Sequence, residues 1–255
     1  LEAEWPYDSW FRGWKNVRRE RRVLLGALSG VVCISRTLLD KLTTAYPLRC
    51  PTAVVPCGVQ SKFLAPEVNL GPNIKRIVYV GSLSSLEGVD VLVQAMQWID
   101  ATLEIYTRSQ PGRALKEMVT RLGLESKVAF CRSLDHGQVP HVLQTADALV
   151  IPLPGENLVS QSSSPLKLFE YLAAGKPIVA SDVPGIGEIL EDRKNALLFR
   201  ASDPRSLART VHILQSDSGL ARRIASAALK DAGKYTWDMR AKAVIRFLDG
   251  IRSSL

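Results

Sequence analysis

Residues with chemical potential are concentrated in the stretch SSSPLKLFEYLAAGKPIVAS, which starts at residue 162. Ser164 is a good helix N-cap, and Pro165 suits the first helical position. Gly175 suits the position just past a helix end, and the proline two residues later prevents continuation. We therefore predict a helix of about three turns over residues 165–174.

The start of this helix is a potential anion site. The first amides of a helix lack acceptors within the helix, and the helix dipole places partial positive charge there. Lys167 in the first turn opposes the dipole, a cost that a bound phosphate would reverse. The alternative is a helix that only packs on a sheet and carries a solvated pair of Lys167 and Glu170.

The elements around this helix alternate between apolar strands and helices. The predicted strands are VVCIS (31–35), TAVVP (52–56), RIVYVG (76–81), TLEIYT (102–107), KVAFC (127–131), DALVIP (147–152), PIVAS (177–181) and ALLF (196–199). Most are continuously apolar, which indicates strands buried on both faces of a parallel sheet. The predicted helices between and after them cover residues 89–98, 113–122, 138–145, 165–174, 207–215, 220–234 and 239–251. This alternation predicts a doubly wound α/β fold.

The order of elements also predicts a division into domains. Residues 1–64 are expected to be the remnant of an N-terminal domain, and residues 65–73 form a linker by composition. Residues 74–234 are expected to form one complete domain. A last helix within 235–255 carries an apolar stripe and is expected to return across the domain junction.

Composition narrows the class of protein. The chain has 255 residues, 46% of them hydrophobic, and a formal net charge of +8. This charge suits phosphate-bearing ligands, anionic membranes or nucleic acid, but no nucleic-acid-binding motif occurs, so no nucleic-acid partner is expected. No apolar run reaches the roughly 18–20 residues of a membrane span, and no signal peptide is recognisable. The first residue is Leu1, not methionine. Because residues 1–64 contain only the end of a domain, we expect a fragment or a trimmed product, with a naturally short protein as the alternative.

Cysteine and histidine give little support for a metal site. Cys33, Cys50, Cys57 and Cys131 form no CxxC pair and no cluster with histidine, so no metal is expected and reduced thiols in the cytoplasm are the simpler interpretation. His136 and His141 flank a predicted turn and are expected at the surface, whereas His212 is expected to be structural.

The N-terminal segment WPYDSWFRGWKNVRRERR, residues 5–22, combines tryptophans with arginines. This pattern suits an amphipathic helix in contact with a membrane surface. The alternative is a domain helix whose tryptophans cover a core and whose arginines face water.

Two longer blocks carry a family resemblance. The blocks VGSLSSLEGVDVLVQAM (80–96) and SPLKLFEYLAAGKPIVASDVPGIGEIL (164–190) resemble the donor-binding half of a family 4 glycosyltransferase of the GT-B fold. Residues 20–42 and 54–63 resemble the end of that family's first domain, so the resemblance covers nearly the whole chain. It implies a Rossmann-like donor domain, a partial N-terminal Rossmann-like domain, and sugar transfer from a UDP- or GDP-linked donor with retained anomeric configuration.

The resemblance also implies roles for individual residues. Glu170 would hydrogen-bond the ribose, the amides of Leu166 and Lys167 would receive the diphosphate, and Gly81 would let the backbone approach it. Residues 132–134 lie where the family's backbone meets the base. The implied donor site comprises Gly81, Ser82, Arg132, Ser133, Ser164, Leu166, Lys167 and Glu170, with Glu156 and Lys167 as the catalytic candidates.

Three departures from the family pattern stand out. Ser82 and Glu87 occupy positions where the family usually has arginine and lysine, so two cations that would balance a diphosphate are missing. Thr107 and Arg108 replace glycine beside the nucleotide, and Lys167, Arg108 or Arg132 could supply charge instead. The family's sugar-contacting glutamate is matched either by Glu156, across an insertion, or by no acidic residue.

We therefore expect a retaining glycosyltransferase with no cofactor besides its donor and with a glycan or lipid-linked acceptor. We expect it in the cytoplasm, with peripheral contact to the inner membrane face through residues 5–22 if that segment binds lipid. The alternatives are a degenerate glycosyltransferase-like domain that binds nucleotide or scaffolds a partner, and another GT-B-like enzyme such as a nucleotide-sugar epimerase.

Overall fold

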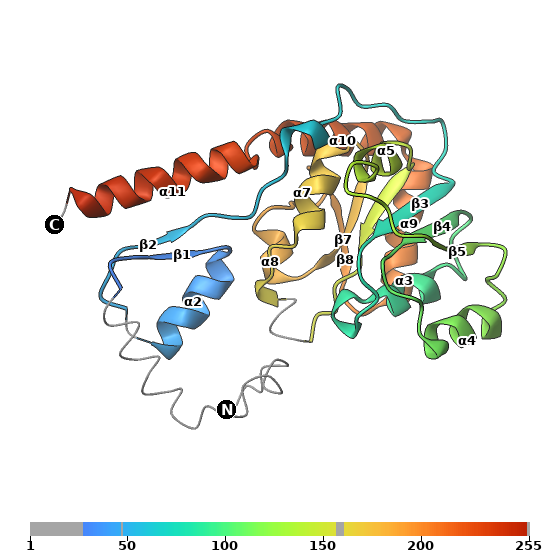
Figure 1. The fold of residues 1–255 in the computed structure, drawn as a ribbon. Coiled ribbons are helices and arrows are strands. Elements are labelled where there is room, and N and C mark those ends of the chain that lie inside the picture. The colour runs from blue at the N-terminus through green and yellow to red at the C-terminus, as the bar shows by residue number, and fades with distance from the viewer. Residues whose placement is uncertain (1–27, 47, 157–160, 254–255) are drawn as a thin grey trace.

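The computed structural model describes residues 28–46, 48–156 and 161–253, and most of these residues surround one six-stranded parallel sheet (Figure 1). Its strands are β3 (Arg76–Val80), β4 (Thr102–Tyr106), β5 (Val128–Cys131), β6 (Ala148–Ile151), β7 (Ile178–Asp182) and β8 (Leu197–Arg200). Their spatial order is β5-β4-β3-β6-β7-β8, and all neighbours are parallel. The order reverses between β3 and β6, where open parallel sheets usually bind their ligands.

Both faces of the sheet are covered, which explains why the strands read as continuous apolar runs. In β3, Ile77 and Tyr79 belong to one core, whereas Val78 belongs to the core on the other face. The helices α3 (Val89–Ala95), α4 (Arg113–Arg121) and α9 (Pro204–Ser216) contribute to the first core. The helices α5 (Val139–Gln144), α7 (Leu166–Ala173) and α8 (Pro184–Gly187) contribute to the second, and α10 (Ser218–Ala232) contributes to both.

A smaller unit precedes the sheet. It consists of β1 (Val31–Cys33), α2 (Arg36–Ala45) and β2 (Thr52–Val54), and the two strands pair in parallel. Ser35 caps α2, because its hydroxyl accepts a hydrogen bond from the amide of Leu38 at 3.0 Å. Between β2 and β3 the chain forms a short 3₁₀ turn (Ser61–Phe63) and then no regular element.

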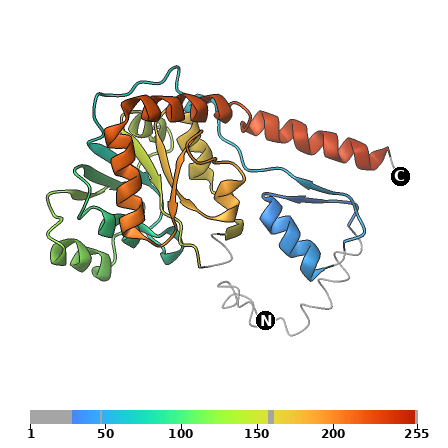
Figure 2. The ribbon, with the colours of Figure 1, turned by 180° about the vertical axis from the view of Figure 1, so that it is seen from behind.

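The last helix, α11 (Trp237–Arg252), connects the two units. Figure 2 shows that it leaves the six-stranded sheet and extends toward β1 and β2. The start of α11 is hydrogen-bonded to the segment after β2. The amide of Trp237 donates to the Val59 carbonyl at 3.1 Å, and the Arg240 guanidinium donates to the carbonyls of Val55 and Pro56.

The doubly wound fold predicted from the sequence is confirmed, and all eight predicted strands occur within two residues of their expected ends. Two helix boundaries differ by three residues, and the others by two or fewer. The helix α3 ends at Ala95 rather than residue 98, and α9 begins at Pro204 because Asp203 caps it. The short α8 was not predicted. The proposed division into domains remains a prediction.

Candidate functional site

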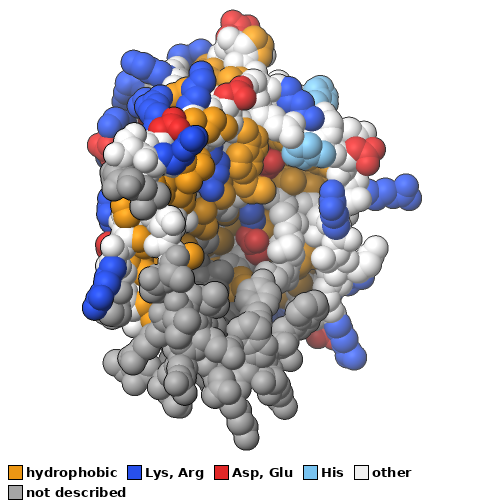
Figure 3. Space-filling view, turned by 60° about the vertical axis from the view of Figure 1, so that its left-hand side comes forward, with side chains coloured by type: hydrophobic (Ala, Val, Ile, Leu, Met, Phe, Trp, Pro, Cys, Tyr) orange, Lys and Arg blue, Asp and Glu red, His pale blue; other side chains and the backbone are white. Residues whose placement is uncertain are grey.

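A cavity of about 510 Å³ opens at the carboxyl ends of β3, β4 and β5, beside the switch in strand order. The first turns of α7 form its opposite wall. The space-filling view shows this face hollowed, with charged side chains around the hollow (Figure 3). The lining residues are Val80, Gly81, Ser82, Glu87, Tyr106, Thr107, Arg108, Ser109, Ser133, Leu134, His136, Val139, Pro165, Leu166, Lys167 and Glu170.

The start of α7 presents free amides to this cavity. The amides of Leu166 and Lys167 donate no hydrogen bond to a described residue, and the Leu166 side chain is 51% exposed. Farther along, Leu168, Phe169 and Leu172 are buried against the sheet, which fixes the helix direction. The anion site expected at this helix start is therefore open to the cavity.

The predicted cap of α7 is wrong. The N-cap residue is Pro165, which makes no side-chain cap, and the helix begins at Leu166. Ser164 is 6% exposed and does not line the cavity. Its hydroxyl accepts from the amide of Cys57 at 3.4 Å, so a contact 107 residues away in sequence takes the hydroxyl from the helix. The other end agrees with the prediction, since Gly175 adopts φ +66°.

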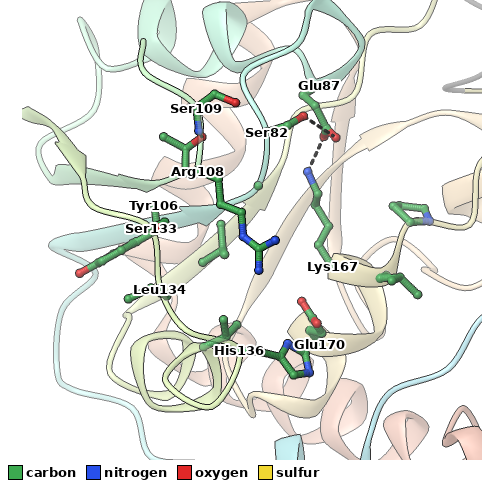
Figure 4. A pocket seen from close by; sticks show the side chains of 16 residues that line it. Ser82, Glu87, Tyr106, Arg108, Ser109, Ser133, Leu134, His136, Lys167 and Glu170 are labelled. Carbon is green, nitrogen blue, oxygen red and sulfur yellow. Dashed lines mark hydrogen bonds and ion pairs between the residues drawn. The ribbon is translucent and has the colours of Figure 1, made fainter.

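The Lys167 ammonium is held inside the wall of the cavity. It forms an ion pair with Glu87 (Figure 4). It also donates to the Tyr79 hydroxyl at 2.9 Å. The Lys167 and Glu87 side chains are only 10% and 22% exposed. Burial lowers the pKa of Lys167, and the charge of Glu87 opposes that change. The alternative interpretation, a solvated pair of Lys167 with Glu170, is not observed, since the ion pair of Lys167 is with Glu87.

Gly81 leaves room for that arrangement. A Cβ atom at Gly81 would lie 2.6 Å from the Tyr79 hydroxyl and 2.7 Å from Lys167 Nζ. These two side chains explain why glycine suits position 81, and Gly81 also lines the cavity, so its approach to a diphosphate stays a prediction. Tyr79 also donates to the Ser82 carbonyl at 2.8 Å, so it supports the loop that follows β3.

Glu87 is positioned by a tight turn before α3. It ends a 3₁₀ turn (Ser85–Glu87), and the next residue, Gly88, adopts φ +65°. A Cβ at Gly88 would lie 1.8 Å from the Pro152 carbonyl oxygen, so only glycine fits. Glu87 also approaches Ser82 Oγ at 3.4 Å. The two departures, Ser82 and Glu87, therefore lie side by side at the cavity wall.

Glu170 lies one turn into α7, with its side chain in the cavity wall (Figure 4). Burial raises the pKa of its carboxyl, and the nearby His136 and Lys167 act in the opposite direction. His136 packs on the Phe63 ring with centroids 5.1 Å apart. His136 is exposed, as expected, and it also lines the cavity.

Arg108 is the second cation of the cavity. It follows β4, is exposed, and forms no hydrogen bond or ion pair with any described residue. Beyond it lies a neighbouring cavity of about 520 Å³, which shares Thr107, Arg108, Ser109 and Ser133 with the first. Arg132 lines this second cavity rather than the first.

The structure therefore brings together most of the expected donor-site residues. Gly81, Ser82, Ser133, Leu166, Lys167 and Glu170 line one cavity. Ser164, Arg132 and Glu156 do not line it; Glu156 is exposed beside residues 157–160, which lie outside the described part of the chain. Tyr79 and Tyr106 were missed, because their strands gave only a packing signal.

Two further findings concern the described residues. They contain no cluster of three or more histidine, cysteine, aspartate or glutamate side chains arranged to hold a metal. No described helix has the length and apolar character that spanning a membrane requires. The membrane interpretation of residues 5–22 lies outside the described residues.

Comparison with known proteins agrees with this geometry. The family model "Glycosyl transferases group 1" matches residues 74–217. The chain belongs to the group 1 glycosyltransferases. An uncharacterized glycosyltransferase of Methanocaldococcus jannaschii is 31% identical over 176 residues, which are 67% of this glycosyltransferase chain and 44% of the relative.

Solved structures show the same fold. Sucrose-phosphate synthase from Thermosynechococcus elongatus has a TM-score of 0.80 at 21% identity and covers 93% of this glycosyltransferase chain and 62% of its own. HepE from Anabaena in complex with UDP-glucose has a TM-score of 0.74 at 21% identity, and the match covers 91% of this chain and 67% of the HepE chain. The chain spans about half the length of the curated relatives it matches, namely 44% and 42% of the first two.

Proposed function

We propose that the cavity binds the nucleoside diphosphate of a UDP- or GDP-linked sugar and that the protein transfers this sugar, with retained anomeric configuration, to a hydroxyl of a glycan or lipid-linked acceptor. One observation carries the proposal. The unpaired amides at the start of α7 and the Glu170 carboxylate, one turn apart, face the same cavity at the switch in strand order.

Each part of a donor has a matching part of the cavity. The amides of Leu166 and Lys167 suit the diphosphate, because a helix start attracts anions. Glu170 suits the ribose, since a carboxylate accepts hydrogen bonds from paired hydroxyls. The base would lie toward Ser133 and Leu134, after β5. HepE, which shares the fold, binds UDP-glucose, and this favours UDP as the first nucleotide to test.

The transfer step follows from this placement. As the bond between the sugar and the diphosphate breaks, negative charge grows on the leaving phosphate, and fixed amides there lower the barrier. For retention, the acceptor hydroxyl attacks on the face from which the diphosphate leaves, and a phosphate oxygen takes its proton. The proposal therefore assigns no side chain as general base, and the contact of Glu156 with the sugar remains a prediction.

Ligand-induced stabilisation tests the proposal. A ligand that binds only the folded protein raises its melting temperature, and a concentration of about 100 times Kd corresponds to roughly 5 °C or more for a chain of this size. We expect this increase with UDP or GDP, a smaller one for Glu170→Gln, and an unchanged one for Glu125→Gln, an exposed glutamate outside the cavity. No increase with UDP, GDP or ADP would contradict donor binding.

A second candidate function is a nucleotide-binding module that no longer transfers sugar. The internal pair of Lys167 with Glu87 favours it, because this lysine charge is already neutralised. Incubation with radiolabelled UDP-glucose and GDP-mannose separates the two candidates. Transfer to an acceptor, or slow transfer to water, supports the enzyme, whereas tight UDP binding with no turnover by the full-length protein supports the module.

A further inference from the structure

The cavity holds only one uncompensated lysine or arginine among the residues that the structure describes. Lys167 and Arg108 are the two that line it. The Lys167 ammonium forms an ion pair with Glu87 and donates a hydrogen bond to the Tyr79 hydroxyl. It also lies 4.6 Å from the centroid of the Tyr79 ring. A diphosphate at the start of α7 would therefore meet Lys167 as one half of a neutral pair.

Arg108 has the opposite surroundings. It is exposed and unpaired, and Figure 4 shows its guanidinium in the middle of the cavity, facing the side from which Lys167 and Glu170 project. The neighbouring cavity that shares Arg108 is also lined by Lys116 and Arg132 and by no acidic side chain. Like charges on that side disfavour a turn of Arg108 away from the main cavity.

A planar guanidinium suits a diphosphate better than an ammonium does. It offers five donors in a fixed fork and can bind two phosphate oxygens at once. With the helix amides on one wall and Arg108 on the other, a diphosphate between them would have donors on both sides.

We propose that Arg108 is the residue that binds the charge of the donor's diphosphate, while Glu87 withholds Lys167 from it. The inference rests on the proposed function, because it assumes that a nucleoside diphosphate occupies the cavity. It makes Arg108 a determinant of specificity for charged nucleotides over nucleosides, and it gives Lys167 the role of holding Glu87 and Tyr79 in the wall.

A series of ligands with increasing charge tests the inference. Affinities of the full chain for uridine, UMP and UDP are measured by calorimetry for wild type, Arg108→Gln and Arg113→Gln. Arg113 is a matched control, because it lies on α4, pairs with Glu117 and does not line either cavity. We expect Arg108→Gln to lower UDP affinity about 10- to 100-fold, UMP affinity less and uridine affinity little. The salt dependence of UDP binding should fall as well.

A second variant compares the two cations. Replacing the internal pair with Lys167→Met and Glu87→Gln together removes one charge of each sign. We expect this double variant to lose less of the preference for UDP over uridine than Arg108→Gln does. Circular dichroism and melting temperature confirm that each variant is folded.

The outcomes distinguish the inference from the proposed function. If wild type binds none of UDP, GDP and ADP, the proposed function fails. If wild type binds UDP but Arg108→Gln binds it equally well, or loses uridine and UDP to the same extent, the inference alone is overturned. A larger loss of UDP preference in the double variant would assign the diphosphate to Lys167 and also overturn it.

Discussion

At the scale of single residues, the unusual Glu87 is explained by its partner. A carboxylate beside a diphosphate site is unfavourable in isolation, yet here it compensates a lysine ammonium that is itself almost buried. The pair places both charges in the wall and leaves little net charge there. What looks like the loss of a binding cation is, in the structure, an internal ion pair.

Removing one member of the ion pair between Lys167 and Glu87 should reveal the free-energy cost of burying the other charge without a partner. We expect Glu87→Gln to lower the free energy of unfolding by about 2–4 kcal/mol at neutral pH, since it leaves a buried ammonium unpaired. Part of the loss should return as pH rises. With its folded pKa below the unfolded value, Lys167 binds fewer protons in the folded state, so stability increases toward alkaline pH.

A double-mutant cycle checks this interpretation by urea denaturation. Glu87→Gln combined with Lys167→Met should regain most of the lost stability, because no unpaired charge remains. Losses that simply add in the double variant would show that the two side chains are not energetically coupled.

Glu170 gives a prediction with a definite pH dependence. Burial raises the pKa of its carboxyl, so the folded state binds more protons than the unfolded state between the two pKa values. The contribution of Glu170 to stability is therefore fully present below its ordinary pKa and is lost as pH rises through the raised value. Glu170→Gln should be more stable than wild type at pH 8, and this advantage should shrink toward pH 4.

The same substitution should weaken nucleotide binding by about tenfold or more, because hydrogen bonds to a charged acceptor are lost. Denaturation at several pH values and UDP titration at pH 8 measure the two effects. The His136→Asn variant, in the same experiments, separates the contribution of the facing histidine. A Glu170→Gln protein that is less stable than wild type at pH 8 would contradict the assignment of burial as the dominant cause.

The sequence predicted some of these residues and could not predict others. Glu170 and the amides of α7 were found, because helix signals are local and the three-residue spacing of Lys167 and Glu170 can be read directly from the chain. The partner of Lys167 was not, since Glu87 is 80 positions away. The same limit applies to Ser164. The local sequence predicts that its hydroxyl caps α7, but the hydroxyl instead accepts a hydrogen bond from the amide of Cys57, which is distant in sequence.

At the scale of elements, buried strands were the most predictable features. The two faces of β3 pack into different cores, so every side chain in the strand after Arg76 is apolar or aromatic. This continuous apolar run can be read directly from the sequence. The short α8 was missed because three of the four residues in its sequence, PGIG, are proline or glycine, which disfavour helix interiors. It forms where the Val183 carbonyl accepts from the amides of Ile186 and Gly187, both at 3.0 Å.

The turn before α3 gives a matched test at this scale. Gly88 and Gly123 adopt nearly the same conformation, φ +65° and +63°, but only Gly88 has atoms within 4 Å of an added Cβ. We expect Gly123→Ala to cost about 1–2 kcal/mol, which is the price of the left-handed conformation alone. Gly88→Ala should cost about 3 kcal/mol or more, because its Cβ would overlap the Pro152 carbonyl.

Loss of Gly88 should also disturb the site, since Glu87 precedes it in the turn. Thermal denaturation and UDP binding of both variants measure the two effects. Equal destabilisation by the two substitutions would mean that the turn yields to the extra atom, and that its geometry does not depend on Pro152.

At the scale of the whole molecule, hydrogen bonds between residues far apart in sequence join the two units. The carboxylate of Glu188, at the end of α8, accepts from the amides of Arg36 and Thr37 at 2.6 and 2.8 Å, so it binds the start of α2. On the other side, α11 contacts the segment after β2. Neither contact has a local sequence signal, because each joins residues more than 150 positions apart.

The contact made by Arg240 should govern how readily α11 separates from the segment after β2. Its guanidinium donates to two backbone carbonyls, Val55 and Pro56, so Arg240→Ala removes charge-assisted bonds that nothing else replaces. Local opening becomes easier when such bonds are lost, while the global stability of the six-stranded sheet does not depend on them. We expect amide hydrogen exchange in residues 53–59 and in the first turns of α11 to accelerate about tenfold, with little change in β3 and β6.

Arg246→Ala is the control, because Arg246 lies on the same helix, is exposed and makes no hydrogen bond with a described residue. Equal exchange in the two variants would show that the apolar contacts of α11, such as Ile251 against Gly30, hold the joint without Arg240.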